Sequence, residues 1–301
     1  MTMPTNSIET VTKFAAVLDK VYKKGSCFSN LDPSPTAIQP TDQAGVFKIQ
    51  KIVLTGLGDY SKTTGFPKGK ITVSWELVQY TQDRARAFQV DALDETEAMG
   101  VFGNVSTEFT RVHTVPEIDA YRCAKLCSDF GIDVKADLST AAGWISALNT
   151  AYEALAARGV DLSRLVLYIT SAGKHKVDIS VPATDGVTDV FTKVSEVVEV
   201  SVDRFYSAIT LDDGSEEDEG GYAKAVGAYD VNFILMDKGA AWADAKHQAM
   251  RVWSPRGENG YAQNPDGDAW KYEYRIAHDC FTYENRVEGG YVHTGATALA
   301  S

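Results

Sequence analysis

The sequence lacks the features that mark membrane-spanning and exported proteins. No stretch reaches the run of about 18 apolar residues that a membrane-spanning helix needs. The first residues, MTMPTNSIET, hold no basic region followed by an apolar core, so we expect no secretory signal. Cysteine is scarce, with four residues in 301 and no CxxC pair, which argues against a disulfide scaffold and favours a reducing compartment such as the cytoplasm.

The motifs of common enzyme sites are also missing. The chain has no GxSxG elbow, no GxxxxGKS or GxxxxGKT phosphate loop, no GxGxxG and no HExxH. The histidines show no metal-ligand spacing. The most site-like of them, His278, adjoins Asp279, but alternation along a strand places these neighbours on opposite faces. We therefore expect no catalytic residue, no cofactor and no metal. The five histidines are His113, His175, His247, His278 and His293.

Two clusters of metal-ligand residue types have simpler explanations. Cys123 and Cys127 are four residues apart and share a face of a helix, where they suit either a shared metal or, as we favour, two small buried side chains. Residues Asp212 to Gly221 read DDGSEEDEGG but lack the spacing of a calcium-binding EF-hand loop. We interpret this segment as a solvated surface loop.

Basic residues are in the minority, 29 against 41 acidic ones, for a formal net charge of −12. Because binding to phosphates depends mainly on Lys and Arg, this balance argues against nucleic-acid binding through overall charge. Near nucleic acid, the same acidity would keep the protein surface from adhering.

What the chain does contain is an ordinary globular composition, 44% hydrophobic and 23% charged. Hydrophobic spacing predicts strands and helices that are interleaved without regular βαβ alternation, which indicates an α+β fold. Helices are expected at 7–24, 137–158, 171–177 and 239–247, and strands at 46–54, 71–80, 165–170, 194–202, 231–236, 250–253, 270–284 and 291–295.

The stretch from Gly58 to Leu126 organises the prediction. A strand pair with a glycine- and lysine-rich loop comes first, and Arg84–Val90 is expected to continue it. A helical run from Asp91 to Leu126 follows, with acids in its first turn and a kink at Pro116. One chain has difficulty burying so extended a hairpin and helix, so we expect neighbouring copies of the chain to bury them.

The densest charge cluster lies between Asp83 and Glu95. It suits a carboxylate site with arginine clamps, or salt bridges at the base of the hairpin and the start of the helix, which we favour and which can join subunits. The candidates for contact between subunits are Phe14, Leu18, Lys62, Phe66, Lys68, Lys70, Trp75, Asp83, Arg84, Arg86, Asp91, Asp94 and Glu95.

The order of several motifs carries a family resemblance. The run GDYSKTTGF, KGKITVSWE, DRARAFQVDALDETEA, FTR and VPEIDAYR, closed by WKYEYRIAHDCFTYENRVEGGYVH, resembles the major capsid proteins of tailed bacteriophages. These proteins have the Hong Kong 97-type fold, and the likeness is to a siphophage-like subgroup. The resemblance is weakest before Val46 and between Thr184 and Tyr229.

The resemblance implies an architecture of named parts. Residues 1–45 would be an N-terminal arm and residues 46–92 an extended E-loop hairpin. Residues 93–136 would be a peripheral domain with a long spine helix, residues 137–265 an axial domain, and residues 266–301 strands that return to the peripheral domain.

The resemblance also implies a structural function without catalysis. The chain would self-assemble, as pentamers and hexamers, into the icosahedral head that encloses the double-stranded DNA of a tailed phage, within a virion assembled in the host cytoplasm. Scaffold, portal and decoration proteins would be its partners, and DNA would be packaged without sequence-specific binding. The alternatives are an encapsulin-type bacterial nanocompartment shell and a soluble enzyme that uses the Asp83–Glu95 cluster.

Overall fold

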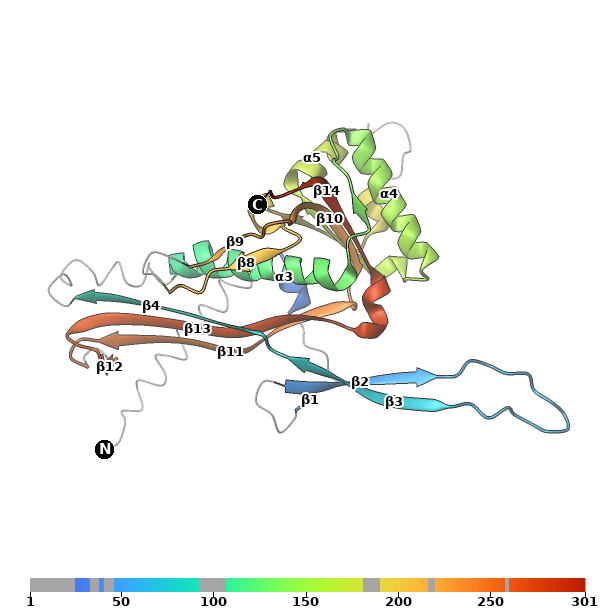
Figure 1. The fold of residues 1–301 in the computed structure, drawn as a ribbon, viewed down its shortest axis with the longest axis horizontal. Coiled ribbons are helices and arrows are strands. Elements are labelled where there is room, and N and C mark those ends of the chain that lie inside the picture. The colour runs from blue at the N-terminus through green and yellow to red at the C-terminus, as the bar shows by residue number, and fades with distance from the viewer. Residues whose placement is uncertain are drawn as a thin grey trace.

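The computed structural model describes residues 25–32, 38–40, 46–91, 107–180, 190–215, 220–257 and 260–300. The expected N-terminal helix at 7–24, with Phe14 and Leu18, lies outside the described residues, and so do Asp94 and Glu95. The described residues form four sheets and three α-helices in one α+β body from which a hairpin projects (Figure 1).

The larger sheets have five and four strands. The five-stranded sheet has the order β5-β14-β10-β6-β7 and the four-stranded sheet β12-β11-β13-β4. Their strands are β4 Gln82–Asp91, β5 Val134–Lys135, β6 Leu165–Thr170, β7 Glu196–Val200, β10 Tyr229–Asp237, β11 Ala241–Ser254, β12 Ala262–Gln263, β13 Ala269–Thr282 and β14 Gly290–Ala298. The smaller sheets contain β1 Ile38–Pro40, β2 Val46–Leu54 and β3 Ile71–Gln79, and β8 Ile209–Leu211 and β9 Tyr222–Lys224.

Strand β6 lies between β10 and β7 in the five-stranded sheet, and its unbroken apolar run LVLYIT is buried at all six residues. Helix α4, Ala141–Ala157, packs against this sheet through a stripe that includes Trp144 and Leu148. Thr140 caps the helix, because its hydroxyl accepts a hydrogen bond from the Gly143 amide. Helix α5, Ser171–Ser180, approaches so closely that a Cβ atom on Gly173 would lie 2.4 Å from the Trp144 ring.

The four-stranded sheet corrects two predictions. Residues 239–247 were expected to form a short helix, but they enter strand β11, which pairs with β13 from Ala241 to Trp253. The alanines of this segment favour a helix locally, and pairing with a long neighbouring strand overrides that preference. Arg84–Val90 was expected to continue the hairpin, but β4 leaves the hairpin and pairs with β13.

Two strand pairings cross the expected boundary at residue 265. Strand β11 falls within the expected axial segment 137–265, yet it pairs with β13 of the four-stranded sheet. Strand β14 falls within the expected peripheral segment 266–301, yet it pairs with β10 of the five-stranded sheet. The chain therefore crosses between the two sheets more than once, and the core is continuous between them.

Helix α3, Val115–Phe130, lies along one face of the four-stranded sheet (Figure 1). Val115 and Ile118 are buried against Tyr272 and Ile276 of β13. Residues 107–109 are helical, and a π-helical turn at Thr110–Thr114 joins them to α3. Pro116 follows directly in the first turn of α3, so the regular α-helical pattern is interrupted next to the residue that the sequence singled out.

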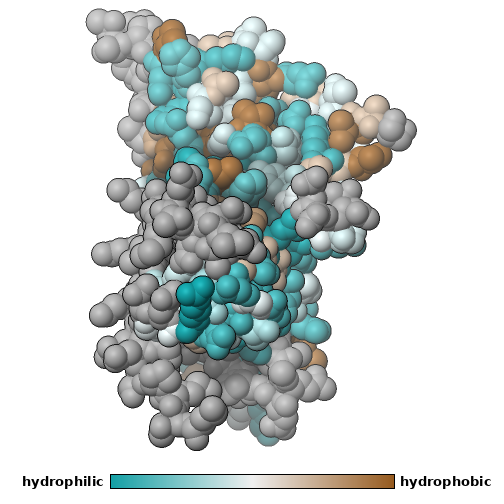
Figure 2. Space-filling model, turned by 90° about the vertical axis from the view of Figure 1, so that its left-hand side faces the viewer, coloured by the Kyte–Doolittle hydropathy of each residue, from teal (hydrophilic) through white to brown (hydrophobic). Residues whose placement is uncertain are grey.

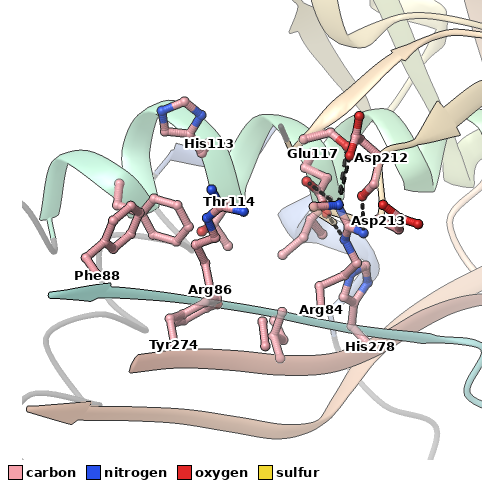
Figure 3. Close-up of a pocket in the computed structure, with 17 residues that line it drawn as sticks. Arg84, Arg86, Phe88, His113, Thr114, Glu117, Asp212, Asp213, Tyr274 and His278 are labelled. Carbon is pink, nitrogen blue, oxygen red and sulfur yellow. Dashed lines mark hydrogen bonds and ion pairs between the residues drawn. The ribbon is translucent and has the colours of Figure 1, made fainter. Parts of the chain in front are cut away.

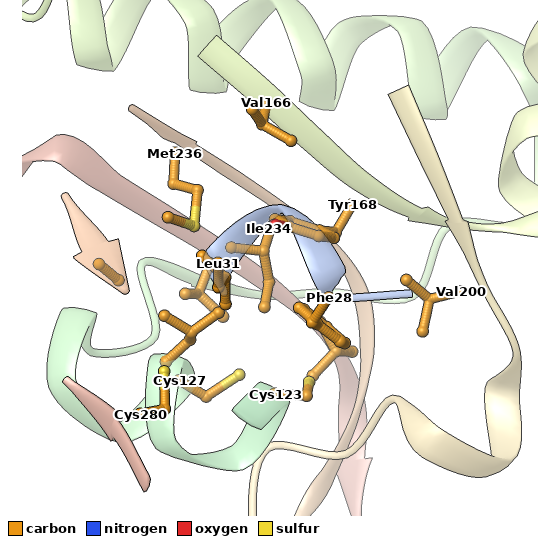
Figure 4. Packing of buried hydrophobic residues seen from close by; sticks show 14 of the residues in the cluster. Phe28, Leu31, Cys123, Cys127, Val166, Tyr168, Val200, Ile234, Met236 and Cys280 are labelled. Carbon is orange, nitrogen blue, oxygen red and sulfur yellow. The ribbon is translucent and has the colours of Figure 1, made fainter. Parts of the chain in front are cut away.

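The segment Ser26–Asp32 is inserted into the core between α3 and the five-stranded sheet. Phe28 is fully buried and stacks on Tyr168 at 4.6 Å between ring centroids. Cys123 and Cys127 pack in the same cluster as small buried side chains (Figure 4). This part of the expected N-terminal arm therefore belongs to the core of its own chain.

Buried charges hold the inserted segment in place. Asp119 of α3 is fully buried and accepts hydrogen bonds from the Ser26 hydroxyl at 2.5 Å, the Cys27 amide at 2.9 Å and Arg204 at 3.2 Å. Arg122, one turn along the helix, donates to the Phe28 carbonyl and to Asp32. Each charge is paired, which is the condition for burying it without a large cost.

Candidate functional site

The hairpin of β2 and β3 carries an exposed apolar surface. In the antiparallel register, Leu54 lies opposite Ile71 and Ile52 opposite Val73, so these side chains share one face. Trp75 and Leu77 continue the same face, and Leu77 is 67% exposed. We call this surface the apolar stripe; it consists of Ile52, Leu54, Ile71, Val73, Trp75 and Leu77.

Among the described residues, it is the base of the hairpin that packs on its own chain. Ile49 and Val78, on the opposite face, are buried against Trp242 and Phe281. Lys51 forms an ion pair with Glu284 at 2.6 Å. Beyond this base the two strands and their loop project away from the body (Figure 1). The apolar stripe is therefore held outward on a fixed support.

The loop at the end of the hairpin, residues 55–70, is basic and aromatic in an otherwise acidic protein. Lys62, Lys68 and Lys70 are exposed. The rings of Tyr60 and Phe66 pack together at 5.1 Å between centroids, yet Phe66 remains 86% exposed. Contact between the two rings gives the loop local order without burying them, which suits a surface that meets another protein.

The face of the molecule away from the hairpin has a different character. Figure 2 shows that hydrophilic residues dominate much of it and that hydrophobic residues are scattered over its upper part. Scattered hydrophobic side chains are normal on a soluble surface. Among the described residues, the continuous apolar surface to be explained is the stripe on the hairpin.

The predicted charge cluster is divided between two faces of the four-stranded sheet. Asp83 faces away from α3 and forms a bidentate pair with Arg275, whose hydrogen bonds lower the pKa of the Asp83 carboxyl. Arg84 faces α3 instead and pairs with Glu117. Asp91 ends β4, where it lies opposite Ala269. Alternation along β4 thus separates the Asp83 carboxylate from the Arg84 guanidinium, and each is paired with a different element.

Sequence reasoning missed the partners of this cluster. Glu117, Arg275 and the carbonyls of Asp212 and Gly221 lie far from β4 in sequence, and no local pattern pointed to them. Glu117 stands in the quoted PEIDAYR motif, so its position was visible but its partner was not.

A pocket of about 260 Å³ lies between β4, the start of α3 and the loop that joins β8 to β9 (Figure 3). Phe88, Phe109, Tyr274 and Ile276 provide apolar walls. Its rim includes Asp212 and Asp213 together with the glycines of the loop. Arg84 closes one end by donating hydrogen bonds to Glu117 and to the Asp212 and Gly221 carbonyls.

One wall of this pocket has an unusual polar group. His278 is 2% exposed, and among the described residues none is a hydrogen-bond partner of its Nδ1 atom. Burial, with Arg122 and Arg84 nearby, lowers the pKa of His278 to about 3, so the ring is neutral at physiological pH. The π-helical turn that contributes Thr114 and His113 to the lining adds a second irregular feature, of a kind often found at functional sites.

The described residues contain no cluster of three or more His, Cys, Asp and Glu that could hold a metal ion. No helix in this described part of the chain is long and apolar enough to cross a membrane. The described surfaces that remain to be explained are therefore the apolar stripe, the basic hairpin loop and the pocket beneath the β8–β9 loop.

Comparison with solved structures identifies the fold. The mature capsid of bacteriophage PhiM1 aligns over 85% of this chain and 83% of its own, with a TM-score of 0.60 and 10% identity. The capsid of cyanophage P-SCSP1u aligns over 86% and 85%, with a TM-score of 0.58 and 9% identity. The virus-like particle from Pyrococcus furiosus aligns over 95% and 99%, with a TM-score of 0.56 and 14% identity.

No protein-family model matches the sequence, and no curated protein matches it. The structural similarity nevertheless extends over most of each chain. The prediction of a Hong Kong 97-type α+β fold, as in tailed-phage capsid proteins, is confirmed.

Proposed function

We propose that this protein is the major capsid protein of a tailed phage and that it assembles into an icosahedral shell around double-stranded DNA. The observation that carries the proposal is the apolar stripe on a hairpin that projects from a capsid-type fold. Its role is structural, with no reaction to catalyse. The finished location is the virion, after assembly in the host cytoplasm.

The apolar stripe supplies a driving force for assembly. Burying six partly exposed apolar side chains against a neighbour contributes on the order of 5 to 10 kcal/mol per subunit before the costs of association. The hairpin of one copy meets a different surface on the next, so the contact is heterologous. Such contacts close into rings, here pentamers and hexamers, when the rotation between subunits allows it.

The acidic balance suits a shell that encloses DNA. A net charge of −12 repels phosphates, so the genome can be packed without adhering to the wall. Scaffold and portal proteins would direct assembly, and decoration proteins would bind the finished surface. In the capsid nomenclature, β2 and β3 would form the E-loop and α3 the spine helix.

A nanocompartment shell is the second candidate. It is favoured by the alignment with the Pyrococcus furiosus particle, which covers nearly all of both chains. This shell would use the same stripe for assembly but would enclose proteins instead of a genome.

Expression and electron microscopy test the proposal. The chain, produced with the neighbouring genes of its source genome, should give closed particles with icosahedral symmetry. Nuclease-protected double-stranded DNA in the particles from infected cells supports the capsid, and protein cargo supports the nanocompartment. If the folded chain gave only monomers or small discrete oligomers, both the capsid and the nanocompartment proposals would be overturned.

A further inference from the structure

We infer that Tyr80 and Thr81 form a clamped joint that fixes the direction of the hairpin, and with it the angle at which copies of the chain meet in a shell. The ladder between β2 and β3 ends at Gln79, and the ladder between β4 and β13 begins at Gln82. Tyr80 and Thr81, which we call the joint, therefore link two separate sheets. The joint belongs to the folded subunit, whereas its effect on a shell rests on the proposed function.

The sequence of the joint favours a stiff connection. Hinges that absorb large backbone changes often contain small residues such as glycine. The glycines of the hairpin lie instead in the loop at its far end, residues 55–70. At the joint an aromatic residue precedes a β-branched one, and both types favour extended backbone. The sequence therefore places backbone freedom in the loop and not at the joint.

Two acids lie directly opposite each other where the joint meets the body. Asp244 of β11 and Asp279 of β13 are partners in the antiparallel register. Like charges in such positions repel, and Asp279 is only 2% exposed, so the pair carries a cost that hydrogen-bond donors must offset. The joint supplies donors to both carboxylates.

The Asp279 carboxylate holds the joint and helix α3 together. The Thr81 amide and hydroxyl both donate to Oδ2 at 2.8 Å. The Tyr121 hydroxyl of α3 donates to Oδ1 at 2.7 Å, and the Cys280 amide donates to the same oxygen at 2.8 Å. Because all four hydrogen bonds go to one buried carboxylate, the position of Thr81 relative to β13 and α3 is closely defined.

Tyr80 fixes the other side of the joint. Its hydroxyl donates a hydrogen bond to Asp244, and its ring packs against Phe281 in a T-shaped arrangement at 5.5 Å between centroids. Burial raises the pKa of the Tyr80 phenol, and the hydrogen bond to Asp244 raises it further, so the phenol stays protonated and can donate. Two consecutive residues are thus anchored to two strands, β11 and β13, which leaves the chain little freedom to turn between the sheets.

The apolar contact at the base of the hairpin does not define a direction by itself. Ile49 and Val78 are buried against Trp242 and Phe281, and apolar contact is non-directional. Hydrogen bonds are directional, so the joint selects one angle among those that the apolar contact allows. Each copy in a shell repeats the same contact with its neighbours, so a spread in the hairpin angle becomes a spread in curvature.

Distance measurements on unassembled subunits test the joint. In a Cys27→Ser background, in which the other three native cysteines are buried, spin labels are attached after Thr72→Cys on the hairpin and Glu153→Cys on α4. Both labelled positions are exposed. Tyr80→Phe combined with Thr81→Val removes both hydroxyls with little change in side-chain size. The width of the distance distribution should at least double in this double variant.

Two controls separate the joint from general stability. Thr81→Ser retains the hydroxyl and should keep the original width. Tyr222→Phe removes a phenol hydrogen bond to the Asp203 carbonyl, on β9 of the body, and should also leave the width unchanged. A double variant with the original width would overturn the role of the joint.

Electron microscopy of assembled particles tests the link to curvature. The original chain should give shells of one diameter, and the double variant should give a distribution of diameters at least twofold wider. If the distance distribution widens while the shells keep one diameter, the joint does not set the angle between copies and the inference is overturned. Failure of the original chain to form any shell would overturn the capsid proposal instead, and the distances in unassembled subunits do not depend on that outcome.

Discussion

Arg84 of β4 and Glu117 of α3 form a bidentate ion pair, with Arg84 Nε 2.6 Å from Glu117 Oε1 and Nη2 3.3 Å from Oε2. The same guanidinium donates to the carbonyls of Asp212 and Gly221. The Arg84 side chain thus joins β4, the edge strand of the four-stranded sheet, to helix α3 and to the β8–β9 loop at the rim of the pocket. A lysine has too few donors in this geometry to replace it.

Removing Arg84 should therefore destabilise the subunit and loosen the rim of the pocket. Both members of the pair are largely shielded from solvent, so Arg84→Ala should lower the free energy of unfolding by about 1 to 3 kcal/mol. Urea unfolding of the subunit measures this. Arg111→Ala breaks a fully exposed pair with Glu108 and serves as the control, which should change little. Equal stability of the Arg84→Ala variant and the original chain would contradict this account.

The apolar stripe predicts a defect in assembly that leaves folding intact. Changing Ile71 and Leu77, which are 70% and 67% exposed, to serine removes mostly exposed apolar surface, so the unfolding curve of the subunit should stay close to the original. The subunit concentration needed for shell formation should rise roughly tenfold or more. Light scattering across a concentration series measures it.

Val78→Ala is the matched control for the stripe. Val78 is buried at the base of the hairpin, so its truncation should destabilise the subunit itself by about 1 kcal/mol or more. If the stripe variant assembled as readily as the original chain, the stripe would have no role in the contact between subunits.

His278 predicts a loss of stability in acid. Its ring is neutral in the folded state, with a pKa of about 3, while the unfolded chain has an ordinary pKa of 6.5. Between these values the unfolded state binds the proton and the folded state does not. The free energy of unfolding should therefore fall as the pH drops from about 6.5 towards 3, by at most about 1.4 kcal/mol per pH unit.

The control for this pH dependence is His278→Gln, which cannot titrate. Repulsion from Arg122 of α3 and Arg84 of β4 disfavours the protonated ring, and the Tyr121 ring packs against it in a T-shaped arrangement. The difference in stability between the variant and the original chain should thus change with pH in this window. A constant difference would show that His278 titrates normally.

Substitution of Asp119 should release the inserted segment Ser26–Asp32 from the core. Asp119→Ala leaves Arg204 and the Cys27 amide without their buried acceptor, so the subunit should lose about 3 to 5 kcal/mol. Hydrogen exchange at the amides of residues 27–31 should accelerate more than in β6. Asp129→Asn, which breaks a partly exposed pair with Lys125, is the control and should leave this segment protected.

Local patterns predicted much of the body of the fold. Strand β6 is buried on both faces, so its sequence is an unbroken apolar run that predicts a central strand. Helix α4 is buried on one face, so its apolar residues recur at helical spacing and predict the helix. Residues 239–247 were predicted wrongly, since their alanine-rich composition favours a helix that pairing with β13 replaces. For Arg84–Val90 the strand was predicted but its sheet was not, because strand alternation does not name a partner.

The candidate site divides in the same way. The basic loop could be identified from the composition around Phe66 and Lys68, and the apolar face of the hairpin from the alternation that includes Trp75. The pocket could not, since it forms where β4, α3 and the β8–β9 loop converge. No sequence pattern marks such a convergence.

The sequence by itself determined most of the long strands, the principal helices of the body and a hairpin with an apolar face, because these depend on spacing along the chain. Tertiary structure decided which strand pairs with which, that Asp83 and Arg84 turn to opposite faces, and that Ser26–Asp32 fills the core of its own chain. These outcomes depend on contacts between residues up to about two hundred positions apart. The free energy gained by burial and pairing between residues so far apart cannot be predicted from the sequence around either one.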